Sequence, residues 1–378
     1  MPPPPRMSAG IKAKIAHKDT PEIFIFYFLN ITYLELRLQP SVAIVWVNYN
    51  SMGFLSLVKR SLDSIASLDY RDFSLIVVDN GSYDGSYEAI RDHVKGLGID
   101  IRVIRLDHNI GFPGANNIGY LAMPSDAKYF VAINNDMVVS RDSLKRLISY
   151  AEDRKNVASV QGVLLDLDSG LIDAAGCFVD ELMLSVHPFS GEPLERALKF
   201  LPAAVTYVNG AYMVVKREAI EECIGRTPFP WHGFLYIDDN ILGLKLWECG
   251  YRSVAIPIVA GYHRRGSSLG RGAIYHYYAI RSWVAVSWIS NSRYKEIIPL
   301  IALSTAIRRS IIKSSSIIAR AIRDGIRIGT KLLREIGILD IYRAPILYIT
   351  PSEAIIAIAS PKIIENRWRA QLLASAIK

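Results

Sequence analysis

Short apolar runs that alternate with helical patterns constrain the fold of this 378-residue chain more than any other feature. Four runs of strand length lie at residues 42–47, 75–78, 101–106 and 129–133, and two more lie at 208–215 and 253–258. Between the first four, apolar residues recur every three or four positions, which is the spacing of one helix face. Strands separated by helices predict right-handed βαβ units. We therefore expect an α/β fold whose mostly parallel sheet is covered by helices on both faces.

Each of the first four predicted strands ends in polar residues or glycine. Asp79 and Asp136 directly follow fully apolar strands, where an unpartnered carboxylate is costly. The carboxyl ends of such strands share one edge of the sheet, where open α/β sheets bind ligands. Asp136 stands beside two amides with no cysteine nearby, and such donors suit Mg²⁺ or Mn²⁺, which can bridge a diphosphate. Asn-Asn-Asp is also ordinary turn chemistry, but the agreement of four strand ends favours a ligand site.

The composition argues against several classes of protein. With 51% hydrophobic residues and a mean hydropathy of +0.19, the chain can bury a sizeable core. No run reaches the about 18 apolar residues that span a bilayer, so we do not expect an integral membrane protein. Cys177, Cys223 and Cys249 form no C-x-x-C pair. This argues against a disulfide framework and a zinc site, and it is typical of a protein in the reducing cytosol.

The net charge of +8 belongs to the C-terminal part of the chain. From Asn291 on, 15 Lys and Arg against 6 Asp and Glu give +9, so the first 290 residues carry about −1. On a helical wheel one set of cations falls within about 80°, namely Arg309, Lys313, Arg320, Arg323, Arg327, Lys331 and Arg334. The opposite side holds Ile307, Ile311, Ile318, Ile322, Leu332, Leu333 and Ile336. This pattern predicts a long basic amphipathic helix, which either lies on an anionic membrane or packs its apolar side on the protein.

We expect three regions along the chain. Residues 1–40 form an N-terminal extension that packs on the body or touches lipid, because its apolar run at 23–29 is too short to span a membrane and is no convincing signal peptide. Residues 41–270 form the α/β domain. Residues 271–378 form a helical, basic C-terminal region.

Several motifs, in order, resemble those of family 2 glycosyltransferases with the Rossmann-like GT-A fold. They are Val-Trp-Val-Asn-Tyr-Asn at 45–50, Val-Asp-Asn-Gly-Ser at 78–82 with Asp-Gly-Ser at 84–86, Asn-Ile-Gly-Phe at 109–112 with Gly114 and Asn117, and Asn-Asn-Asp at 134–136. The resemblance covers roughly residues 41–270 and is closest to the branch that contains rhamnosyltransferases and galactofuranosyltransferases. It implies a sugar donor linked to UDP, dTDP or GDP, a divalent metal, and inversion at the anomeric carbon.

The same resemblance implies roles for individual residues. Asp79 would bind the nucleobase, Asn48 and Asn50 would lie along the nucleoside, and Asp136 would bind Mg²⁺ or Mn²⁺. The other donor-binding positions in these motifs are Asn109, Gly111, Asn117, Asn134 and Asn135. Asn134 stands where the family's D-x-D motif begins with an aspartate, as is common in this branch.

Adjacent carboxylates follow an aromatic cluster at residues 231–236. Asp238 and Asp239 precede a helical pattern, so one of them can cap a helix, an interaction worth about 0.3 to 1 kcal/mol. A cap requires only one carboxylate, whereas sugar transfer to a hydroxyl needs a base within hydrogen-bond reach. The family carries paired acids here, and this implies Asp239 as general base, with Asp238 orienting the acceptor. The family often has another acid where Ile241 stands here.

His263 and Arg264 follow the last predicted strand, and both are candidates for binding the diphosphate end of the donor. His263 resembles the family's late metal-binding histidine, and a neutral imidazole completes a mixed shell acceptable to Mn²⁺ or Mg²⁺. Arg264 can pair with phosphate through its guanidinium. A structural histidine and a solvated surface arginine are the alternatives.

These observations predict an enzyme that transfers a hexose or rhamnose from a nucleotide-diphosphate sugar to a hydroxyl of a glycan or lipid-linked acceptor. We expect it in the cytoplasm, peripheral on the inner face of the cell membrane. One alternative is a polyprenyl-phosphate sugar synthase, which needs no strong base. Another is a non-catalytic membrane-associated protein that binds sugar nucleotides. Nucleic-acid binding is not expected, because the strand ends carry acids rather than basic and aromatic platforms.

Overall fold

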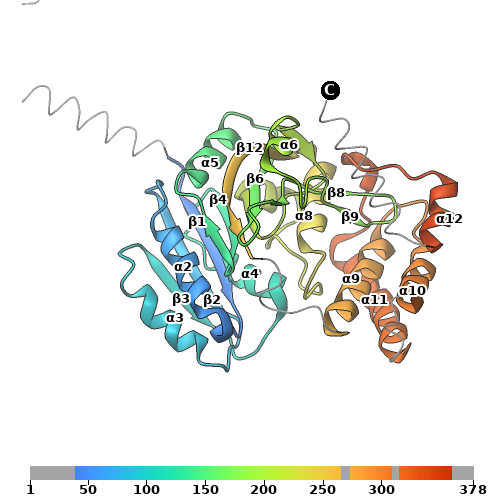
Figure 1. Cartoon of the computed structure of the whole chain (residues 1–378), viewed down its shortest axis with the longest axis horizontal. Coiled ribbons are helices and arrows are strands. Elements are labelled where there is room, and N and C mark those ends of the chain that lie inside the picture. Colours follow the sequence, from blue (N-terminus) through green and yellow to red (C-terminus); the bar gives the residue numbers. More distant parts are fainter. Residues whose placement is uncertain (1–38, 265–272, 309–314, 360–378) are drawn as a thin grey trace, which may run out of the picture. The chain divides into compact units, whose positions relative to one another are not determined.

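Ten of the described strands form one mixed sheet in the order β10-β12-β6-β11-β4-β1-β2-β3, with β5 paired to β12 and β7 to β6 (Figure 1). This is a computed structural model, and it describes residues 39–264, 273–308 and 315–359. The predicted extension at residues 1–40 therefore lies almost wholly outside the described residues. The strands are β1 (Val42–Asn48), β2 (Phe73–Asp79), β3 (Ile101–Arg105), β4 (Tyr129–Asn134), β5 (Met137–Val139), β6 (Val157–Asp166), β7 (Ile172–Ala174), β10 (Ala203–Val205), β11 (Tyr212–Lys216) and β12 (Arg252–His263).

The sheet is parallel where the sequence pattern is strongest. β3, β2, β1 and β4 run parallel, whereas β11 is antiparallel to both of its neighbours, β4 and β6. β6 and β12 are again parallel to each other. Beside this sheet, β8 (Phe178–Val179) and β9 (Ser185–Val186) form a short antiparallel pair. The expected α/β fold with a mostly parallel sheet is confirmed.

Helices cover both faces of the sheet because successive strand residues point to opposite sides. In β1, Ile44 and Trp46 pack with the buried side chains of α2 (Leu55–Ala66), α3 (Ser86–Val94) and α5 (Ser143–Glu152). Ala43 and Val45 pack on the other face with α4 (Gly111–Leu121), α7 (Arg217–Cys223) and α8 (Asp238–Glu248). The remaining short elements of this region are η1 (Met52–Phe54) and α6 (Leu194–Leu198).

One predicted boundary differs from the structure, and one motif lies inside a helix. α4 begins at Gly111 and contains most of the motif at residues 109–117. Pro113 is compatible with this start because the first turn of a helix does not use its N–H groups. The last strand, expected to end near residue 258, continues as β12 to His263 because β5 and β6 both pair with that end.

The C-terminal region is helical, as expected, and its apolar side chains join a third core. Its elements are α9 (Ala273–Ile289), α10 (Ile298–Arg308), α11 (Ser315–Ile336), η3 (Ile341–Arg343) and α12 (Pro351–Ala359). The third core combines residues of these elements, such as Ala285, Ile298 and Leu332, with Ile237, Ile241 and Leu244 of α8 and the segment before it. No helix among the described residues is both long and apolar enough to cross a membrane.

The predicted long basic helix is two helices, α10 and α11, which contact each other. Arg309, Ile311 and Lys313 lie between them, outside the described residues. The apolar side of α11 packs inside the protein, with Ile318 and Leu332 buried. Close contact with α9 depends on glycine: a Cβ at Gly325 would lie 2.6 Å from the carbonyl oxygen of Arg281, and a Cβ at Gly329 would lie 2.7 Å from the Cβ of Trp288.

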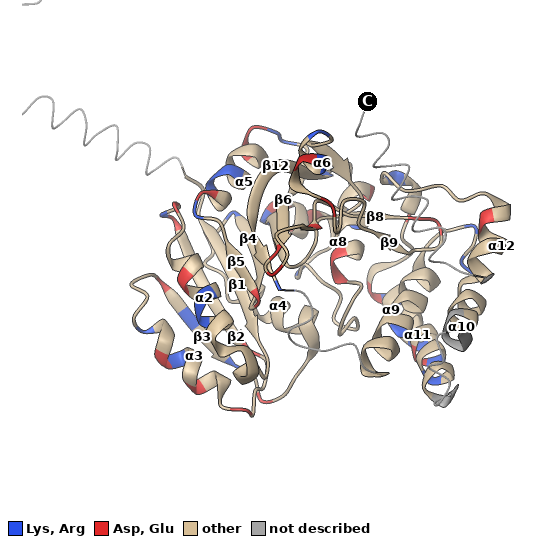
Figure 2. Ribbon diagram, in the orientation of Figure 1, with Lys and Arg blue, Asp and Glu red and all other residues tan. Residues whose placement is uncertain are grey.

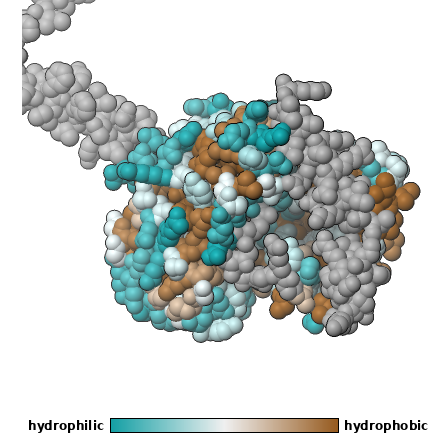
Figure 3. All heavy atoms as spheres, viewed as in Figure 1, coloured by the Kyte–Doolittle hydropathy of each residue, from teal (hydrophilic) through white to brown (hydrophobic). Residues whose placement is uncertain are grey.

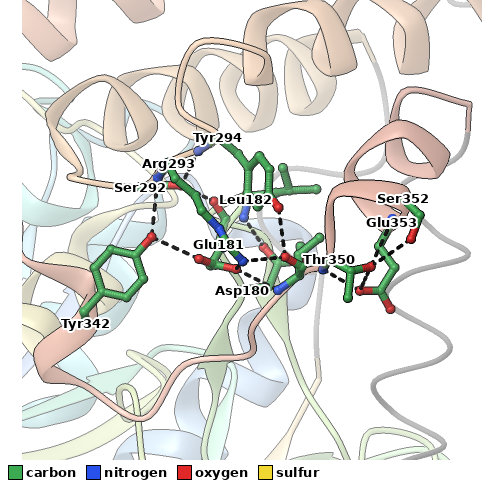
Figure 4. A network of polar contacts seen from close by, with 11 residues as sticks. Asp180, Glu181, Leu182, Ser292, Arg293, Tyr294, Tyr342, Thr350, Ser352 and Glu353 are labelled. Carbon is green, nitrogen blue, oxygen red and sulfur yellow. Dashed lines mark hydrogen bonds and ion pairs between the residues drawn. The ribbon is translucent and has the colours of Figure 1, made fainter.

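A buried carboxylate also joins the C-terminal region to the segment between β8 and β9. Glu181 is 1% exposed and accepts hydrogen bonds from Arg293 Nη2 (2.8 Å), the Tyr342 hydroxyl (2.9 Å) and the Ile349 backbone N–H (2.7 Å) (Figure 4). Removing one partner of a buried charge is strongly destabilising because it leaves the other uncompensated. The network therefore fixes the C-terminal region to the rest of the protein through specific bonds as well as apolar packing.

Candidate functional site

The register of the parallel strands brings distant polar residues to one edge of the sheet. Asn48 of β1 is the register partner of Asp79 of β2, and Val47 is the partner of Asn134 of β4. Asn48, Asp79 and Asn134 therefore end three neighbouring strands at the same level. This is the edge at which the sequence predicts a ligand site.

A buried polar network organises the β1 and β2 ends of this edge. Asn48 Nδ2 donates to Asp79 Oδ1 at 2.8 Å and lies 3.1 Å from the hydroxyls of Ser82 and Ser86. The backbone N–H of Ser82 donates to Asp79 Oδ2 at 3.0 Å. Asn48 and Asp79 are both almost fully buried. Both Asp79 oxygens thus have a partner within the protein, although a carboxylate offers about four lone-pair sites and can accept more.

The exposed part of the β1 and β2 ends is aromatic. Asn50 has a positive φ of 45°, and its Oδ1 accepts a hydrogen bond from the Tyr83 backbone N–H at 3.0 Å. The Tyr83 side chain is 83% exposed, and its ring meets that of Tyr49 edge-on at 6.5 Å. Asn50 therefore holds a loop that presents an aromatic ring to solvent beside the Asn48–Asp79 network.

The Asn109 and Gly111 positions shape the backbone between β3 and α4. Asn109 Oδ1 accepts hydrogen bonds from Asn80 Nδ2 (3.0 Å) and the Gly111 N–H (2.8 Å). Gly111 has a φ of +84°, and a Cβ there would lie 2.5 Å from the carbonyl oxygen of Phe234, so only glycine fits. Asn117 is fully buried in α4, and its amide exchanges two hydrogen bonds with the backbone of Phe229. In this structure Asn117 joins α4 to a distant loop instead of facing solvent.

A carboxylate and an imidazole from distant parts of the sequence meet at the β4–β5 turn. The antiparallel pairing of β12 with β5 places His263 opposite Met137, which follows Asp136. His263 Nε2 lies 3.2 Å from Asp136 Oδ1, and His263 Nδ1 lies 2.8 Å from Asp173 Oδ2. All three side chains are at most 8% exposed. Burial lowers the pKa of His263, but the two carboxylates together outweigh it and raise the pKa to about 9.

The chemistry of this cluster fits a divalent cation. If Nδ1 carries the proton toward Asp173, the lone pair of Nε2 faces Asp136 Oδ1, and a proton or cation between them relieves the repulsion. Asn134 Oδ1 is buried and accepts no hydrogen bond within the described part of the chain, and the buried Asp136 Oδ1 faces His263 Nε2. A carboxylate that orients a metal-binding histidine is a common arrangement. The described residues hold no group of three His, Cys, Asp or Glu with ligating geometry, so Asp136 and His263 would supply two ligands.

Two other predicted donor residues lie close to this cluster. Asn135 is 6% exposed and lies in the β4–β5 turn between Asn134 and Asp136. The backbone N–H of Arg264 donates to the Asp136 carbonyl at 3.1 Å, and its guanidinium lies 3.4 Å from Asp168. Both therefore belong to the surroundings of Asp136.

The predicted carboxylate pair lies at the start of α8. Asp238 is 3% exposed, whereas Asp239 is half-buried. Asp239 Oδ2 accepts a hydrogen bond from the Gly210 N–H at 3.1 Å, and Oδ1 accepts one from the Asn240 N–H at 3.0 Å. Burial raises the pKa of Asp239, against these hydrogen bonds. The pKa of Asp238 is raised well above its usual range by burial and by the charge of Asp239, while Arg281 opposes the change.

Backbone contacts connect the pair to the β4 edge. Asp239 binds Gly210, and the next residue, Ala211, accepts a hydrogen bond from the Asn134 N–H at 2.9 Å. Asn134 is two residues from Asp136. α8 also packs against β12 (Figure 1). A polar surface cavity of about 780 Å³ lies elsewhere. It is lined by Tyr129 of β4 and Lys216 of β11, which pair with each other at the edge of the sheet away from Asn134.

Sequence reasoning missed three side chains that act on this site. Asp173 binds His263, Arg281 approaches Asp238, and Glu335 binds the loop before the pair. Asp173 had a detectable signal, because it interrupts the apolar segment 171–175. Arg281 and Glu335 had none beyond the helical pattern.

Comparison with known proteins identifies the family. Residues 43–223 match the family model described as Glycosyl transferase family 2. The chain is 23% identical over 238 residues to an N-acetylglucosaminyl-diphospho-decaprenol L-rhamnosyltransferase of Mycobacterium tuberculosis (strain ATCC 25618 / H37Rv), covering 58% of this chain and 75% of that protein. It is 27% identical over 245 residues to a protein of Sinorhizobium fredii, covering 63% of this chain but only 26% of that longer relative.

A solved structure confirms the fold. The structure of GalNAc-T7 with UDP, GalNAc and Mn²⁺ matches with a TM-score of 0.56 at 15% identity, covering 79% of this chain and 59% of that chain. This likeness supports the predicted GT-A arrangement of the sheet and helices. The family resemblance inferred from the motifs is confirmed over residues 43–223, which match the glycosyl transferase family 2 model.

Proposed function

We propose that this protein is an inverting, metal-dependent glycosyltransferase that moves a sugar from a UDP-, dTDP- or GDP-linked donor to a hydroxyl of a glycan or lipid-linked acceptor. The observation that carries the proposal is the chain of hydrogen bonds that connects Asp239 to the β4 end beside the Asp136–His263 pair. Asp239 binds Gly210, next to Ala211, which is bonded to Asn134 beside the Asp136–His263 pair.

Asp239 is the general base. It takes the proton of the acceptor hydroxyl as that oxygen attacks the anomeric carbon from the face opposite the departing nucleoside diphosphate. Its raised pKa brings its basicity closer to neutral pH, where a general base is most effective. Asp238, which is buried and has a still higher pKa, orients the acceptor.

The donor lies along the ends of β1, β2 and β4. Asp79 receives the nucleobase, Asn48 and Asn50 border the nucleoside, and the loops carrying Asn109, Gly111, Asn134 and Asn135 surround the remainder. The Asn117 side chain is fully buried and hydrogen-bonds the Phe229 backbone, so its contribution to the same site is indirect. Arg264, next to His263, pairs with the diphosphate.

Asp136 and His263 hold a divalent cation, Mg²⁺ or Mn²⁺. When bound, such a cation neutralises charge on the diphosphate leaving group. Support comes from the approach of His263 Nε2 to Asp136 Oδ1, from the buried Asn134 Oδ1, which accepts no hydrogen bond among the described residues, and from the orientation of His263 by Asp173. The solved relative bound to UDP and Mn²⁺ has the same fold.

Of the two acceptor classes we favour the lipid-linked one, which would bring the protein to the inner face of the cell membrane. The mycobacterial relative is named as an L-rhamnosyltransferase of N-acetylglucosaminyl-diphospho-decaprenol. Arg320 and Arg323 are strongly exposed on α11, where Figure 2 shows a row of basic residues. Exposed apolar side chains on α10 and α12 add a surface for lipid, and they are Leu300, Leu303, Ile355, Ile356 and Ile358. Figure 3 shows hydrophobic atoms gathered over α12.

A two-step assay tests the proposal. Thermal stabilisation is first measured across UDP-, dTDP- and GDP-sugars with and without Mn²⁺, and the stabilising donor is then used in transfer and hydrolysis assays. Stabilisation by one nucleotide class followed by turnover supports the proposal. Stabilisation without turnover identifies a binding protein, whereas transfer to polyprenyl phosphate that survives Asp239→Asn identifies a polyprenyl-phosphate sugar synthase.

A further inference from the structure

The segment leading into the carboxylate pair, residues 229–237, is held from two sides. We call it the aromatic loop because it contains Phe229, Trp231, Phe234 and Tyr236. On one side it is bound to α4, through Asn117 and through the Phe112 N–H, which donates to the Phe234 carbonyl at 3.0 Å. On the other side it is bound to α9 and α11 of the C-terminal region.

The aromatic loop has a conformation that its own residues do not favour. Phe234 and Tyr236 both have a φ of 74°, in the left-handed region that bulky residues rarely adopt. Such backbone persists only where the surroundings fix it, and it concentrates at functional sites. The contacts that hold the loop therefore decide where Asp238 and Asp239 begin α8.

Two consecutive residues of α9 bind the carbonyl groups of this strained stretch. Arg281 Nη2 donates to the Gly233 carbonyl at 2.6 Å, and the Ser282 hydroxyl donates to the Leu235 carbonyl at 2.6 Å. Both side chains are almost fully buried. These bonds hold the carbonyls on either side of Phe234.

Glu335, near the end of α11, binds the beginning of the loop. Its Oε1 accepts a hydrogen bond from the Trp231 N–H at 2.8 Å, and its Oε2 lies 2.7 Å from His232 Nδ1. The side chain of Glu335 is 23% exposed. Side chains of α9 and α11 thus bind four of the five residues from Trp231 to Leu235.

Arg281 also brings a buried charge beside the pair. Its guanidinium carbon lies 4.7 Å from the centroid of the Tyr278 ring and 5.9 Å from that of Phe234, and these two rings stack on each other, so the cation lies beside a stacked aromatic pair. Its Nε and Asp238 Oδ1 are both buried without a hydrogen-bond partner among the described residues. The charge of Arg281 favours the ionised form of the neighbouring Asp238.

We infer that Arg281, Ser282 and Glu335 are positioning residues, through which α9 and α11 hold the aromatic loop and thereby set the orientation of Asp238 and Asp239. This inference rests on the proposed role of Asp239 as base. It makes the C-terminal helices part of the reaction site as well as a surface for lipid.

The test compares matched variants with the unmodified protein. Ser282→Ala removes a buried hydroxyl that binds the loop, whereas Ser287→Ala removes an equally buried hydroxyl of α9 that binds only the Trp283 carbonyl of its own helix. Glu335→Ala is matched in the same way by Thr330→Ala, because the Thr330 hydroxyl binds the Ile326 carbonyl within α11. Glu335→Gln retains acceptor oxygen for the Trp231 N–H and should restore part of the activity.

Hydrolysis of the donor that stabilises the wild type most, with Mn²⁺ and no acceptor, is the activity probe. We expect Ser282→Ala and Glu335→Ala to lower kcat about 10-fold to 100-fold, the loss typical of a misplaced reacting group, with the Kd for donor unchanged. The two control variants should stay within about twofold of the wild type. If Ser282→Ala behaves like Ser287→Ala, the inference is wrong.

Hydrogen exchange of residues 229–248 gives a second readout that does not depend on activity. We expect faster exchange in Ser282→Ala and Glu335→Ala than in Ser287→Ala and Thr330→Ala. Equal exchange in all four variants would refute the positioning role of Ser282 and Glu335. A wild type that turns over none of the donors contradicts the proposed function instead. A variant that loses donor binding and thermal stability together with kcat shows a general structural role and also overturns the inference.

Discussion

The two carboxylates at the start of α8 differ in their surroundings. Asp238 is buried next to Arg281 and the charge of Asp239, whereas Asp239 is half-buried and bonded to the backbone of Gly210 and Asn240. Different environments give neighbouring carboxyl groups different tasks. The half-exposed member can meet an acceptor hydroxyl, and its buried neighbour can orient it.

Replacing Asp239 with Asn should remove the base with little effect on donor binding. We expect kcat to fall at least 10²-fold, of the order lost with a general base, because an amide cannot take up the proton. Transfer kinetics and donor titration measure the two effects separately. Asp142→Asn is a suitable control, since that exposed carboxylate pairs with Arg146 on α5. Turnover retained in Asp239→Asn would contradict the assignment.

The raised pKa of Asp239 predicts how the rate depends on pH. The base acts only as a carboxylate, so activity is present above the raised pKa and is lost as the pH falls through it. We expect the acid limb of the kcat profile to lie above the ordinary carboxyl pKa of about 4. A profile that is flat down to that pH would show that no such group limits the rate.

At the scale of elements, pairing of β12 with β5 is the feature that assembles the Asp136–His263 pair. We expect Mn²⁺ to raise the Tm of the wild type in the presence of donor, and Asp136→Asn and His263→Ala to abolish that rise. EDTA should remove activity, and added Mn²⁺ should restore it. A Tm rise of wild-type size in both variants would place the metal elsewhere.

The helix pair α9 and α11 gives a second prediction at this scale. Gly325→Ala should improve helix propensity by about 0.5 to 1 kcal/mol, but the new Cβ would lie 2.6 Å from the Arg281 carbonyl. Overpacking costs about 1 to 3 kcal/mol, so the net effect should be a lower free energy of unfolding. Denaturant unfolding measures it, with exposed Arg327→Ala expected within about 0.5 kcal/mol of the wild type. A more stable Gly325→Ala would show that the two helices separate readily.

At the scale of the whole molecule, positive charge is concentrated in the C-terminal region, while its apolar core joins that of α8. If this region lies on an anionic membrane, the protein should sediment with vesicles containing phosphatidylserine at low salt and be released at about 1 M salt, where the Debye length is about 3 Å. Changing Arg320, Arg323 and Arg327 to Glu should abolish sedimentation. If the wild type does not sediment at low salt, the proposed membrane binding is wrong.

The alternating strands and helices, the edge of the sheet that carries polar residues, and the family resemblance could all be predicted from the sequence. These properties depend on local periodicity and on chain order, which the sequence contains directly. Asn48 and Asp79 follow this rule, because each ends its own strand and parallel register brings them together.

The contacts between side chains of distant segments could not be predicted from the sequence and are seen only in the folded protein. The Asp173 contact with His263 and the Arg281 and Ser282 contacts with the aromatic loop join residues 90, 48 and 47 positions apart. The same is true of α11, whose apolar stripe was compatible with lipid or protein and packs on α9 through Gly325. Such contacts depend on packing between elements, and local periodicity carries no information about the partner that a buried side chain will find.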